Sequence, residues 1–256
     1  MLFTIFKKIP LMYRYAVIAF TVIAISAFFS SPNTQTAFHF FIAIVAAIVF
    51  DLIFNYVKNR KVIVPYSAYI SGLIIALLLE PSTEFTVLLF VILVAISSKH
   101  LLRWKGKTVF NPATFAIVFS ALFLVFSVTW HGTNSWPVIL VVGLLLLYKI
   151  GRLAIGLSFY IFFGVLMALN SIILGLGIVT ALTSFFLGGY VIFFSFFMVT
   201  EPKTTPFTTK GQILFGILAA LFSFSSQFFV PEFFPLIGLL AANVFTQTIN
   251  KLTLKK

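Results

Sequence analysis

The chain has 256 residues, of which 61% are hydrophobic and 9% are charged, and its mean hydropathy is +1.16. A water-soluble core of this length does not need so many apolar side chains, so the composition predicts a membrane protein and excludes a soluble catalytic domain within these residues. The lack of cysteine excludes a cysteine-ligated iron–sulfur cluster and a thiolate nucleophile, and the three histidines show no metal-ligand or haem-ligand spacing. Redox chemistry would therefore need an organic cofactor, and no metal site is predicted.

The first half of the chain contains five apolar runs that are predicted to be membrane helices, because a spanning helix needs about 20 apolar residues. These runs are Leu11 to Ser30, Phe38 to Tyr56, Tyr66 to Leu79, Phe85 to Ser98 and Pro112 to Val128. The first run could instead be a cleaved signal peptide, since small residues lie near its end. We favour a retained helix, because cleavage would place the new N-terminus outside while the later basic loops still orient the rest.

The second half repeats this arrangement with five further apolar runs. They are Pro137 to Tyr148, Leu153 to Leu169, Phe185 to Val199, Ile213 to Phe229 and Phe233 to Ile249. The segment Ser171 to Thr183 fits either a loop or a helix. We therefore expect an all-α polytopic membrane protein with about ten helices in a single transmembrane domain over residues 1–256.

The 17 Lys and Arg residues all fall on one side of the membrane in this scheme. They precede the first predicted helix or follow the second, fourth, sixth, eighth and tenth. By the positive-inside rule that side is cytoplasmic, which predicts a multi-pass protein of the bacterial inner membrane with both termini in the cytoplasm. The net charge of +12 does not indicate nucleic-acid binding, because the basic residues are divided among short segments instead of sharing one solvated face.

The two halves carry similar motifs in opposite orientations. Ser71-Gly72 begins a short apolar run that ends at Glu80, and Gly188-Gly189 begins another that ends at Glu201. In the predicted topology Glu80 faces outside and Glu201 faces the cytoplasm, as an inverted repeat requires. We expect a first repeat at about 11–128 and a second at about 137–250.

The third and fourth apolar runs have about 14 residues each, too few to cross about 30 Å of hydrocarbon as straight helices. Broken helices leave backbone groups at membrane depth that protein, a cavity or a ligand must satisfy, so a site near the midplane between the halves is expected. Asn111 and Asn243 lie inside apolar runs downstream of each motif. Asn111-Pro112 and Glu201-Pro202 can also be explained as helix termini with capping side chains.

Two polar features lie toward the cytoplasmic side. Asp51 is one to two turns inside the second helix, where a carboxylate is costly to bury, so it is a candidate for ion coupling. The alternative is an ion pair with Lys58 or Arg60. The basic stretch Lys99 to Lys107 follows from the positive-inside rule alone, or it holds a phosphate or an acidic partner surface.

Together these motifs resemble a known family of membrane subunits, NqrB of the Na⁺-translocating NADH:quinone reductase and RnfD of the Rnf complex. The resemblance covers roughly Pro65 to Asn250. The stretches that carry it are Ser71-Gly72 with its leucine-rich run, Lys99-His100-Leu101 through Gly106-Lys107 to Phe110-Asn111-Pro112-Ala113, Met198 to Pro206, and Lys210 to Gly216.

The resemblance implies a ten-helix inverted-repeat fold, similar to that of urea transporters, which holds flavin and passes electrons within ion-pumping complexes. In the family, flavin mononucleotide (FMN) is attached to a Thr of an Asp-x-x-Ser-Gly-Ala-Thr type motif between the fifth and sixth helices. Here residues 129–136 read Thr-Trp-His-Gly-Thr-Asn-Ser-Trp, without an upstream Asp and without Ala before Thr133. We therefore expect this compact member to bind flavin, as FMN or riboflavin, without a covalent bond.

The predicted function is that of an accessory electron-transfer subunit, with other membrane redox subunits or an extracytoplasmic flavoprotein, and a quinone, as partners. No catalytic residue is predicted in this chain. A transporter or channel for a small solute such as flavin, and a purely structural subunit, are the alternatives on the same fold. The residues predicted to line the flavin site are Ser71, Gly72, Glu80, Asn111, Glu201, Thr204 and Asn243.

Overall fold

The computed structural model describes residues 9–254 except 61, 105, 176, 178, 180–182 and 184–187, and ten α-helices lie within these described ranges. The first half contains α2 (Leu11–Ser30), α3 (Thr34–Asn59), α4 (Tyr66–Leu78), α5 (Phe85–Leu101) and α6 (Pro112–Ser120). Between α5 and α6 a small hairpin pairs β1 (Arg103–Trp104) with β2 (Lys107–Thr108) in antiparallel register. Every predicted run of the first half thus contains one helix.

The second half begins after a short 3₁₀ turn, η1 (His131–Thr133). Its helices are α7 (Trp136–Ile150), α8 (Leu153–Ile173), α10 (Gly189–Phe193) with the π-helical turn η2 (Phe194–Met198), α11 (Thr209–Ser226) and α12 (Phe234–Leu254). The start of the predicted run Phe185 to Val199, and most of the segment left open between loop and helix beyond Gly175, lie outside the described residues.

The helix lengths confirm an all-α membrane protein. In the described part of the chain, α2, α3 up to Lys58 and α8 are long and apolar enough to cross a bilayer. The helices α4, α5, α7 and the segment Gly189–Met198 are apolar but shorter. The expectation of short helices in the third and fourth runs is confirmed, since α4 has 13 residues and α5 has 17. That all ten runs cross the membrane stays a prediction.

Side chains near the helix starts explain where several helices begin. The N–H of Thr36 donates to Oδ1 of Asn33 (2.7 Å) at the start of α3, and the N–H of Gly211 donates to Oγ1 of Thr208 (3.1 Å) at the start of α11. Asn111 caps α6 by accepting the N–H of Thr114 (3.1 Å), with Pro112 in the first turn. The capping interpretation of Asn111-Pro112 is therefore confirmed.

The predicted helix from Pro112 to Val128 is too long, because α6 ends at Ser120. After a turn the chain becomes extended, and Val128 pairs with Leu79 in an isolated antiparallel bridge. The N–H groups of Thr129 and Trp130 donate to the carbonyl oxygen of Leu78 (3.0 and 3.1 Å). The extended segment thus satisfies a backbone group freed where α4 ends, a requirement that apolar composition does not reveal.

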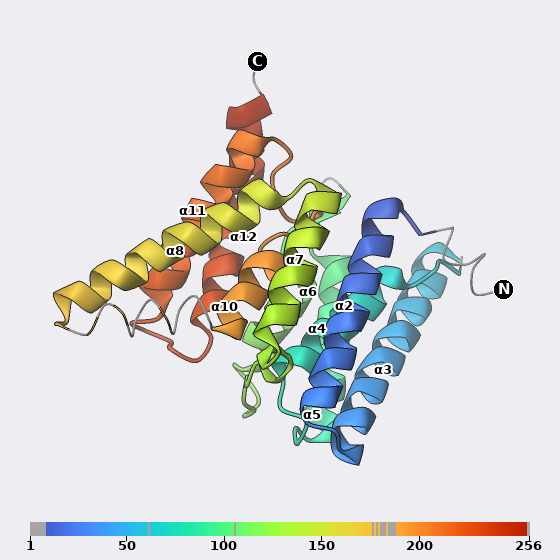
Figure 1. The fold of residues 1–256 in the computed structure, drawn as a ribbon. Helices are drawn as coiled ribbons and strands as arrows, with labels where there is room; N and C mark the ends of the chain where they lie inside the picture. Colours follow the sequence, from blue (N-terminus) through green and yellow to red (C-terminus); the bar gives the residue numbers. More distant parts are fainter. Residues whose placement is uncertain are drawn as a thin grey trace.

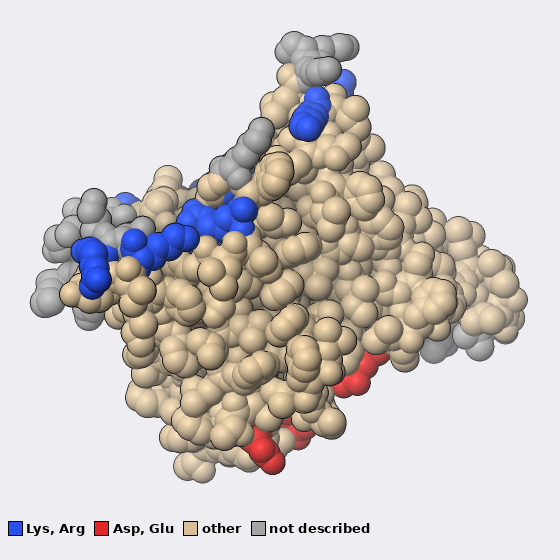
Figure 2. All heavy atoms as spheres, turned by 180° about the vertical axis from the view of Figure 1, so that it is seen from behind, with Lys and Arg blue, Asp and Glu red and all other residues tan. Residues whose placement is uncertain are grey.

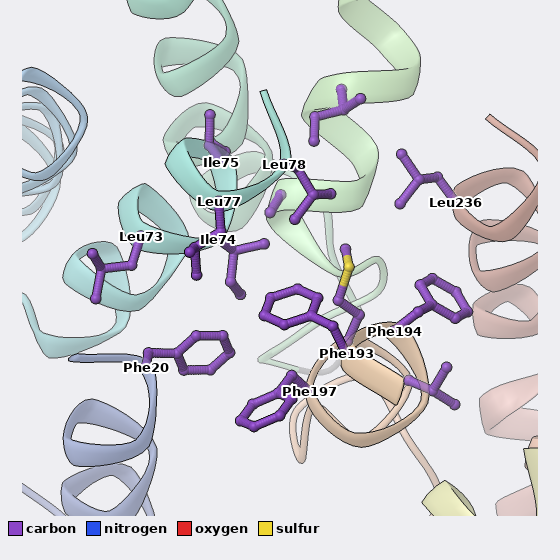
Figure 3. Close-up of a cluster of buried hydrophobic side chains, with 14 of the residues drawn as sticks. Phe20, Leu73, Ile74, Ile75, Leu77, Leu78, Phe193, Phe194, Phe197 and Leu236 are labelled. Carbon is purple, nitrogen blue, oxygen red and sulfur yellow. The ribbon is translucent and has the colours of Figure 1, made fainter. Parts of the chain in front are cut away.

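The centre of the molecule is an apolar core between α4 and α10. Figure 1 shows α4 and α10 inside the bundle, with α2 and α3 side by side at one edge. In Figure 3, Leu77 and Leu78 of α4 lie opposite Phe193 and Phe197, and Phe20 of α2 packs against Phe197 with ring centroids 5.3 Å apart. This core separates the two ends of the molecule.

Charge is divided between those two ends. Figure 2 shows Lys and Arg side chains along one end of the visible face and acidic side chains at the other. Glu80, Glu84 and Glu232 are exposed or partly exposed, whereas Asp51 is only 4% exposed. The halves also pack alike, since α3 contacts α5 and α5 contacts α6, while α8 contacts α11 and α11 contacts α12.

Candidate functional site

A cavity of about 500 Å³ lies among α2, α3, α4, the end of α5, the β-hairpin and the loop that follows η2. We name it the basic cavity. Its wall includes Tyr13 and Tyr66, whose ring centroids are 4.8 Å apart. Residues of both halves contribute to it. The charged residues among its described lining are Asp51, Lys99, Arg103, Lys107 and Lys203.

A narrow cleft of about 50 Å³ adjoins the basic cavity, and the two share Tyr13, Ser67 and Pro202 in their walls. Its polar lining includes Ser71 and Asn111 from the first half and Glu201 from the second. This volume is room for a few water molecules, since each needs about 10–15 Å³ of such space. The cleft is therefore a polar junction between the halves and is too small for a flavin ring.

Asn111 and Asn243 join the two halves directly. The backbone N–H of Asn111 donates to Oδ1 of Asn243 (3.1 Å), and Nδ2 of Asn111 donates to the carbonyl oxygen of Met198 at the end of η2 (3.3 Å). Both asparagines are almost fully buried, with 1% and 2% exposure. The two residues that follow the repeated motifs thus meet each other.

Hydrogen bonds from α12 and from Arg152 hold the loop between η2 and α11 in place. The carbonyl oxygen of Thr204 accepts Nδ2 of Asn243 (3.3 Å) and Oγ1 of Thr246 (2.8 Å). The guanidinium of Arg152 donates to Oγ1 of Thr205 (3.2 Å) and to the carbonyl oxygen of Pro206. These bonds fix the segment that presents Glu201 to the cleft and Lys203 to the basic cavity.

The structure divides the predicted site residues, together with Asp51, into four groups. Ser71, Asn111 and Glu201 come together in the narrow cleft, and Asp51 lines the basic cavity. Thr204 and Asn243 do not line either space and instead support Asn111 and the Glu201 loop.

The remaining two predicted site residues lie elsewhere. Gly72 faces α3, where a Cβ atom would come within 2.7 Å of the carbonyl oxygen of Ala43, so it permits close helix packing. Glu80 lies at the acidic end of the molecule, where it lines a separate hollow of about 350 Å³ with Glu84. The structure does not bring Glu80 to the cleft or to the basic cavity.

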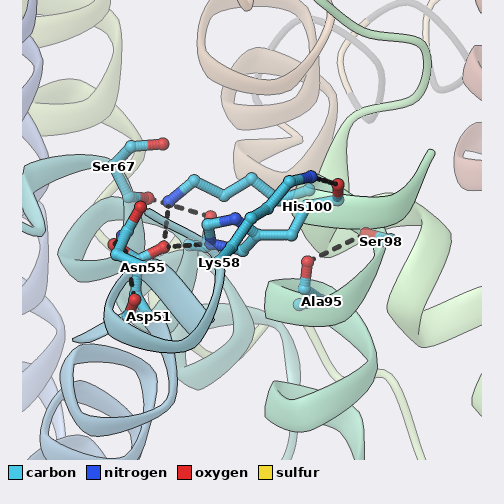
Figure 4. A network of polar contacts seen from close by, with 9 residues as sticks. Asp51, Asn55, Lys58, Ser67, Ala95, Ser98 and His100 are labelled. Carbon is cyan, nitrogen blue, oxygen red and sulfur yellow. Dashed lines mark hydrogen bonds and ion pairs between the residues drawn. The ribbon is translucent and has the colours of Figure 1, made fainter. Parts of the chain in front are cut away.

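Asp51 is the centre of a buried polar network, shown in Figure 4. Its Oδ1 accepts hydrogen bonds from Nζ of Lys99 and Nε2 of His100, both at 2.9 Å, and its Oδ2 accepts Nδ2 of Asn55 at 3.0 Å. The alternative given for Asp51, an ion pair, is therefore present, but its partner is Lys99 and the predicted partners Lys58 and Arg60 were wrong. Lys58 instead donates to the carbonyl oxygen of His100 (3.2 Å), because α3 packs against the end of α5.

Sequence reasoning missed several residues of the basic cavity. Asn55 lies one turn after Asp51, so helical spacing could have found it. His100 stacks on Phe54 with nearly parallel rings whose centroids are 5.3 Å apart. The two residues lie on helices that are far apart in the sequence, so no spacing indicates this contact. Tyr13 and Thr108 also line the cavity, and neither forms part of a recognisable motif.

The electrostatics of the Glu201 loop follow from its burial. Burial raises the pKa of Glu201 to about 7, against the opposing attraction of Lys203 and Lys99. Burial likewise lowers the pKa of the Lys203 ammonium, while Glu201 opposes this shift. Glu201 therefore changes its charge near neutral pH beside both the cleft and the basic cavity.

The pKa of Glu201 leads to a testable pH dependence. Because the pKa of Glu201 in the folded chain lies above its usual value of 4.5, ionisation of Glu201 opposes folding. The stability that the protonated carboxyl group gives is therefore lost as the pH rises from about 4.5 to about 7. Relative to Glu201→Gln, the wild-type chain should lose on the order of 1 kcal/mol of unfolding free energy across this window. Unfolding in detergent at several pH values measures this, with exposed Glu84→Gln as the control. Parallel pH profiles of the wild type and Glu201→Gln would contradict it.

Comparison with protein families places this geometry in a known context. Residues 6–137 match the model of the NQR2, RnfD, RnfE family, which is more than half of the 256 residues. The chain belongs to this family. The resemblance inferred from the motifs is thereby confirmed. The match includes Asp51, Ser71 and Asn111 and stops before the Glu201 loop. Comparison with curated proteins gives no match.

Membership of the NQR2, RnfD, RnfE family, together with the long apolar helices, identifies a multi-pass membrane subunit of the Na⁺-translocating NADH:quinone reductase or Rnf type. Its partners are accordingly the lipid bilayer and other subunits of a membrane complex.

Residues 129–136 correspond to the stretch that carries covalent flavin in the family, and around Thr133 they are closely packed. Thr133 is 9% exposed and lies in η1, and its hydroxyl donates to the carbonyl oxygen of Trp130 (2.8 Å). Gly189 packs so closely that a Cβ atom there would come within 1.9 Å of the Thr133 carbonyl oxygen. Thr133 is thus largely buried, and its hydroxyl is hydrogen-bonded to the residue before η1.

Proposed function

We propose that this protein is an electron-transfer subunit that binds flavin without a covalent bond and relays electrons between partner redox proteins. The observation that carries this proposal is the basic cavity of about 500 Å³, walled by Tyr13 and Tyr66 and rimmed by cationic side chains. Its role would be that of an accessory subunit, in which the bound cofactor supplies the redox chemistry.

The residues of the basic cavity fit a flavin. Cofactor pockets have volumes of about 300–1,000 Å³, a range that includes this cavity. Tyr13 and Tyr66 provide aromatic surface for the isoalloxazine ring, and the lysines on the rim provide charge for a phosphate or for the reduced ring. When bound, the ring supplies one- and two-electron transfer.

Two observations support noncovalent binding. Thr133 is only 9% exposed and its hydroxyl donates to the Trp130 carbonyl oxygen, so this segment offers little room for a phosphoester. Residues 129–136 also lack the Asp and Ala of the flavin-attachment motif.

The proposal includes the orientation and symmetry inferred from the sequence. The separation of basic and acidic side chains supports a bacterial inner-membrane protein with the basic cavity facing the cytoplasm and both termini on that side. The equivalent packing of α3, α5 and α6 and of α8, α11 and α12 supports two inverted repeats. Asp51 is the proposed ion-coupling residue, since it is a buried carboxylate that lines the cavity.

A transporter of a small solute, including flavin, is the second candidate. The core around Leu77, Leu78 and Phe193 closes the molecule between the basic cavity and the acidic end, as in a transporter open to one side. Time-dependent uptake of riboflavin or FMN into proteoliposomes would favour this candidate. Binding without uptake would favour electron transfer.

Loss of the aromatic wall tests the proposed flavin site. We expect Tyr66→Leu to lower flavin affinity about three- to tenfold, because an aromatic contact contributes about 0.5–1.5 kcal/mol beyond its buried area. Fluorescence titration of the detergent-purified protein measures this. Tyr148→Leu is the control, because Tyr148 is 68% exposed and lies outside the cavity. Equal affinities for both variants and the wild type would mean that flavin does not bind in this cavity.

A further inference from the structure

A groove of about 250 Å³ lies between α2 and α3, and α4 forms part of its wall. We name it the lateral groove. Its lining is almost entirely apolar, and the small side chains of Ala24 on α2 and Ala37 on α3 leave space between larger ones. The helix α2 packs mainly on α4 and α7 and touches α3 little, so the groove stays open. None of its described lining residues belongs to the basic cavity or to the narrow cleft.

Two hydroxyl groups are the polar side-chain groups of the described groove lining, and the hydrogens of both are already used. Oγ1 of Thr21 donates to the carbonyl oxygen of Val17 (2.7 Å) and lies 2.8 Å from the hydroxyl oxygen of Tyr69. Because a hydroxyl group has one hydrogen, the Tyr69 hydroxyl is the donor to Thr21. Neither group is left to donate to a carbonyl oxygen of a ligand. The groove therefore favours a hydrocarbon chain over a ring that carries carbonyl groups.

The lateral groove is continuous with the surface that the bilayer covers. Both α2 and α3 are long and apolar enough to cross a membrane, and the groove residues Ile25 and Phe29 are exposed on their surface. From Thr21 to Phe29 the groove follows about 12 Å of helix, at a rise of about 1.5 Å per residue. One leaflet of hydrocarbon is about 15 Å deep, which is half of about 30 Å. The groove thus extends over most of the depth of one leaflet, as an acyl chain does.

One end of the lateral groove lies at the acidic end of the molecule. The groove residue Phe29 is near the end of α2, and Oγ of Ser31 just after this helix is hydrogen-bonded to Nε2 of His131 (3.3 Å). His131 in turn lies close enough to Glu80 for their charges to interact. The described groove lining has no cation that would hold an anionic headgroup. Carboxylates at this end instead attract an ammonium group and repel a net negative charge.

We propose that the lateral groove binds an acyl chain of a zwitterionic phospholipid from the leaflet at the acidic end of the molecule. The chain lies between α2 and α3 beside Ala24 and Ala37, and the ammonium group of the lipid faces the carboxylates. The bound chain fills the space between two helices that touch each other little, and so holds α2 in place. This inference goes beyond the proposed function and does not depend on it, since the groove and the basic cavity share no described lining residue.

Native mass spectrometry of the full-length protein in a mild detergent, with dipalmitoyl phosphatidylethanolamine added, tests this site. Ala24→Phe fills the groove and should lower the lipid-bound fraction about fivefold, because the chain gains packing contacts there. Ala37→Phe should have the same effect, and Ala37 is exposed, so this variant should fold normally. Ala168→Phe is the matched control: Ala168 is a half-buried alanine of α8 outside the groove, and its replacement should leave lipid binding unchanged.

A further variant and a second lipid separate the possible occupants of the groove. Tyr69→Phe should keep lipid binding within about twofold of the wild type, because both hydroxyl hydrogens are already used inside the protein. Dipalmitoyl phosphatidylglycerol should bind at least about threefold more weakly than the zwitterionic lipid, because its headgroup is anionic.

Four results would overturn the acyl-chain site. Lipid binding that Ala24→Phe and Ala37→Phe leave unchanged would place the lipid elsewhere on the protein. A loss in Tyr69→Phe as large as that in Ala24→Phe would show that the ligand is held by a polar group. Tighter binding of phosphatidylglycerol would exclude the zwitterionic headgroup. A dimer that Ala24→Phe dissociates, without bound lipid in the wild type, would show that a second copy of this chain fills the groove.

Discussion

Replacing Asp51 with Asn should lower the free energy of unfolding in detergent by about 3–5 kcal/mol, because the change removes one partner of a buried ion pair. The side chains of Lys99 and Asp51 are only 12% and 5% exposed, and His100 shares the same carboxylate oxygen. Without the carboxylate, the Lys99 ammonium stays buried without a counter-ion. Titration with a denaturing detergent measures the change.

Two comparisons decide whether the Asp51 effect comes from this pair. The double variant Asp51→Asn with Lys99→Gln should recover part of the loss, since no buried charge is then left alone. Exposed Glu84→Gln should change the unfolding free energy by less than about 0.5 kcal/mol. A loss below about 1 kcal/mol for Asp51→Asn would contradict a buried ion pair at this site.

Asn243→Ala should lower the unfolding free energy by about 2–4 kcal/mol, since each buried polar group left without a partner costs about 1–3 kcal/mol. The change removes the acceptor of the Asn111 N–H and one of the two donors to the Thr204 carbonyl oxygen. Gln247→Ala is the matched control, because Gln247 is exposed one turn further along α12. The same detergent titration measures both.

A double-mutant cycle tests whether Asn243 acts through Asn111. Asn111→Ala removes the cap of α6 and the bond to Met198 but keeps the backbone N–H that Asn243 accepts. The two losses should therefore add to within about 0.5 kcal/mol, because Asn243 bonds the backbone of Asn111 and not its side chain. A coupling energy above about 1 kcal/mol would mean that Asn243 acts through the Asn111 side chain.

Much of the helix arrangement could be predicted from the sequence, because apolar runs and polar breaks mark helices directly. Each predicted run of the first half contains one helix, and Asn111-Pro112 caps α6 as the residues indicate. The end of α6 at Ser120 could not be predicted, since the residues that follow are as apolar as the helix. What ends it is a tertiary interaction, the pairing of Val128 with Leu79.

The candidate site was predictable only in part, for the same reason. Ser71, Asn111 and Glu201 carry recognisable motifs, and they meet in one cleft. The partners of Asp51 come from the end of α5, where the positive-inside rule alone explains Lys99. Tyr13 reaches the cavity only because α2 packs against α4, a contact that no spacing within either segment encodes.

Flavin binding without a covalent bond is the central claim, and the most direct measurement is the absorption and fluorescence spectrum of the detergent-purified protein before and after acid precipitation. We predict a flavin spectrum in the native protein and release of all the flavin into the acid supernatant, because residues 129–136 lack the Asp and Ala of the flavin-attachment motif and Thr133 is only 9% exposed. Flavin that stays with the precipitated chain would contradict noncovalent binding. A protein without flavin that also fails to bind added FMN or riboflavin would contradict the electron-transfer function itself.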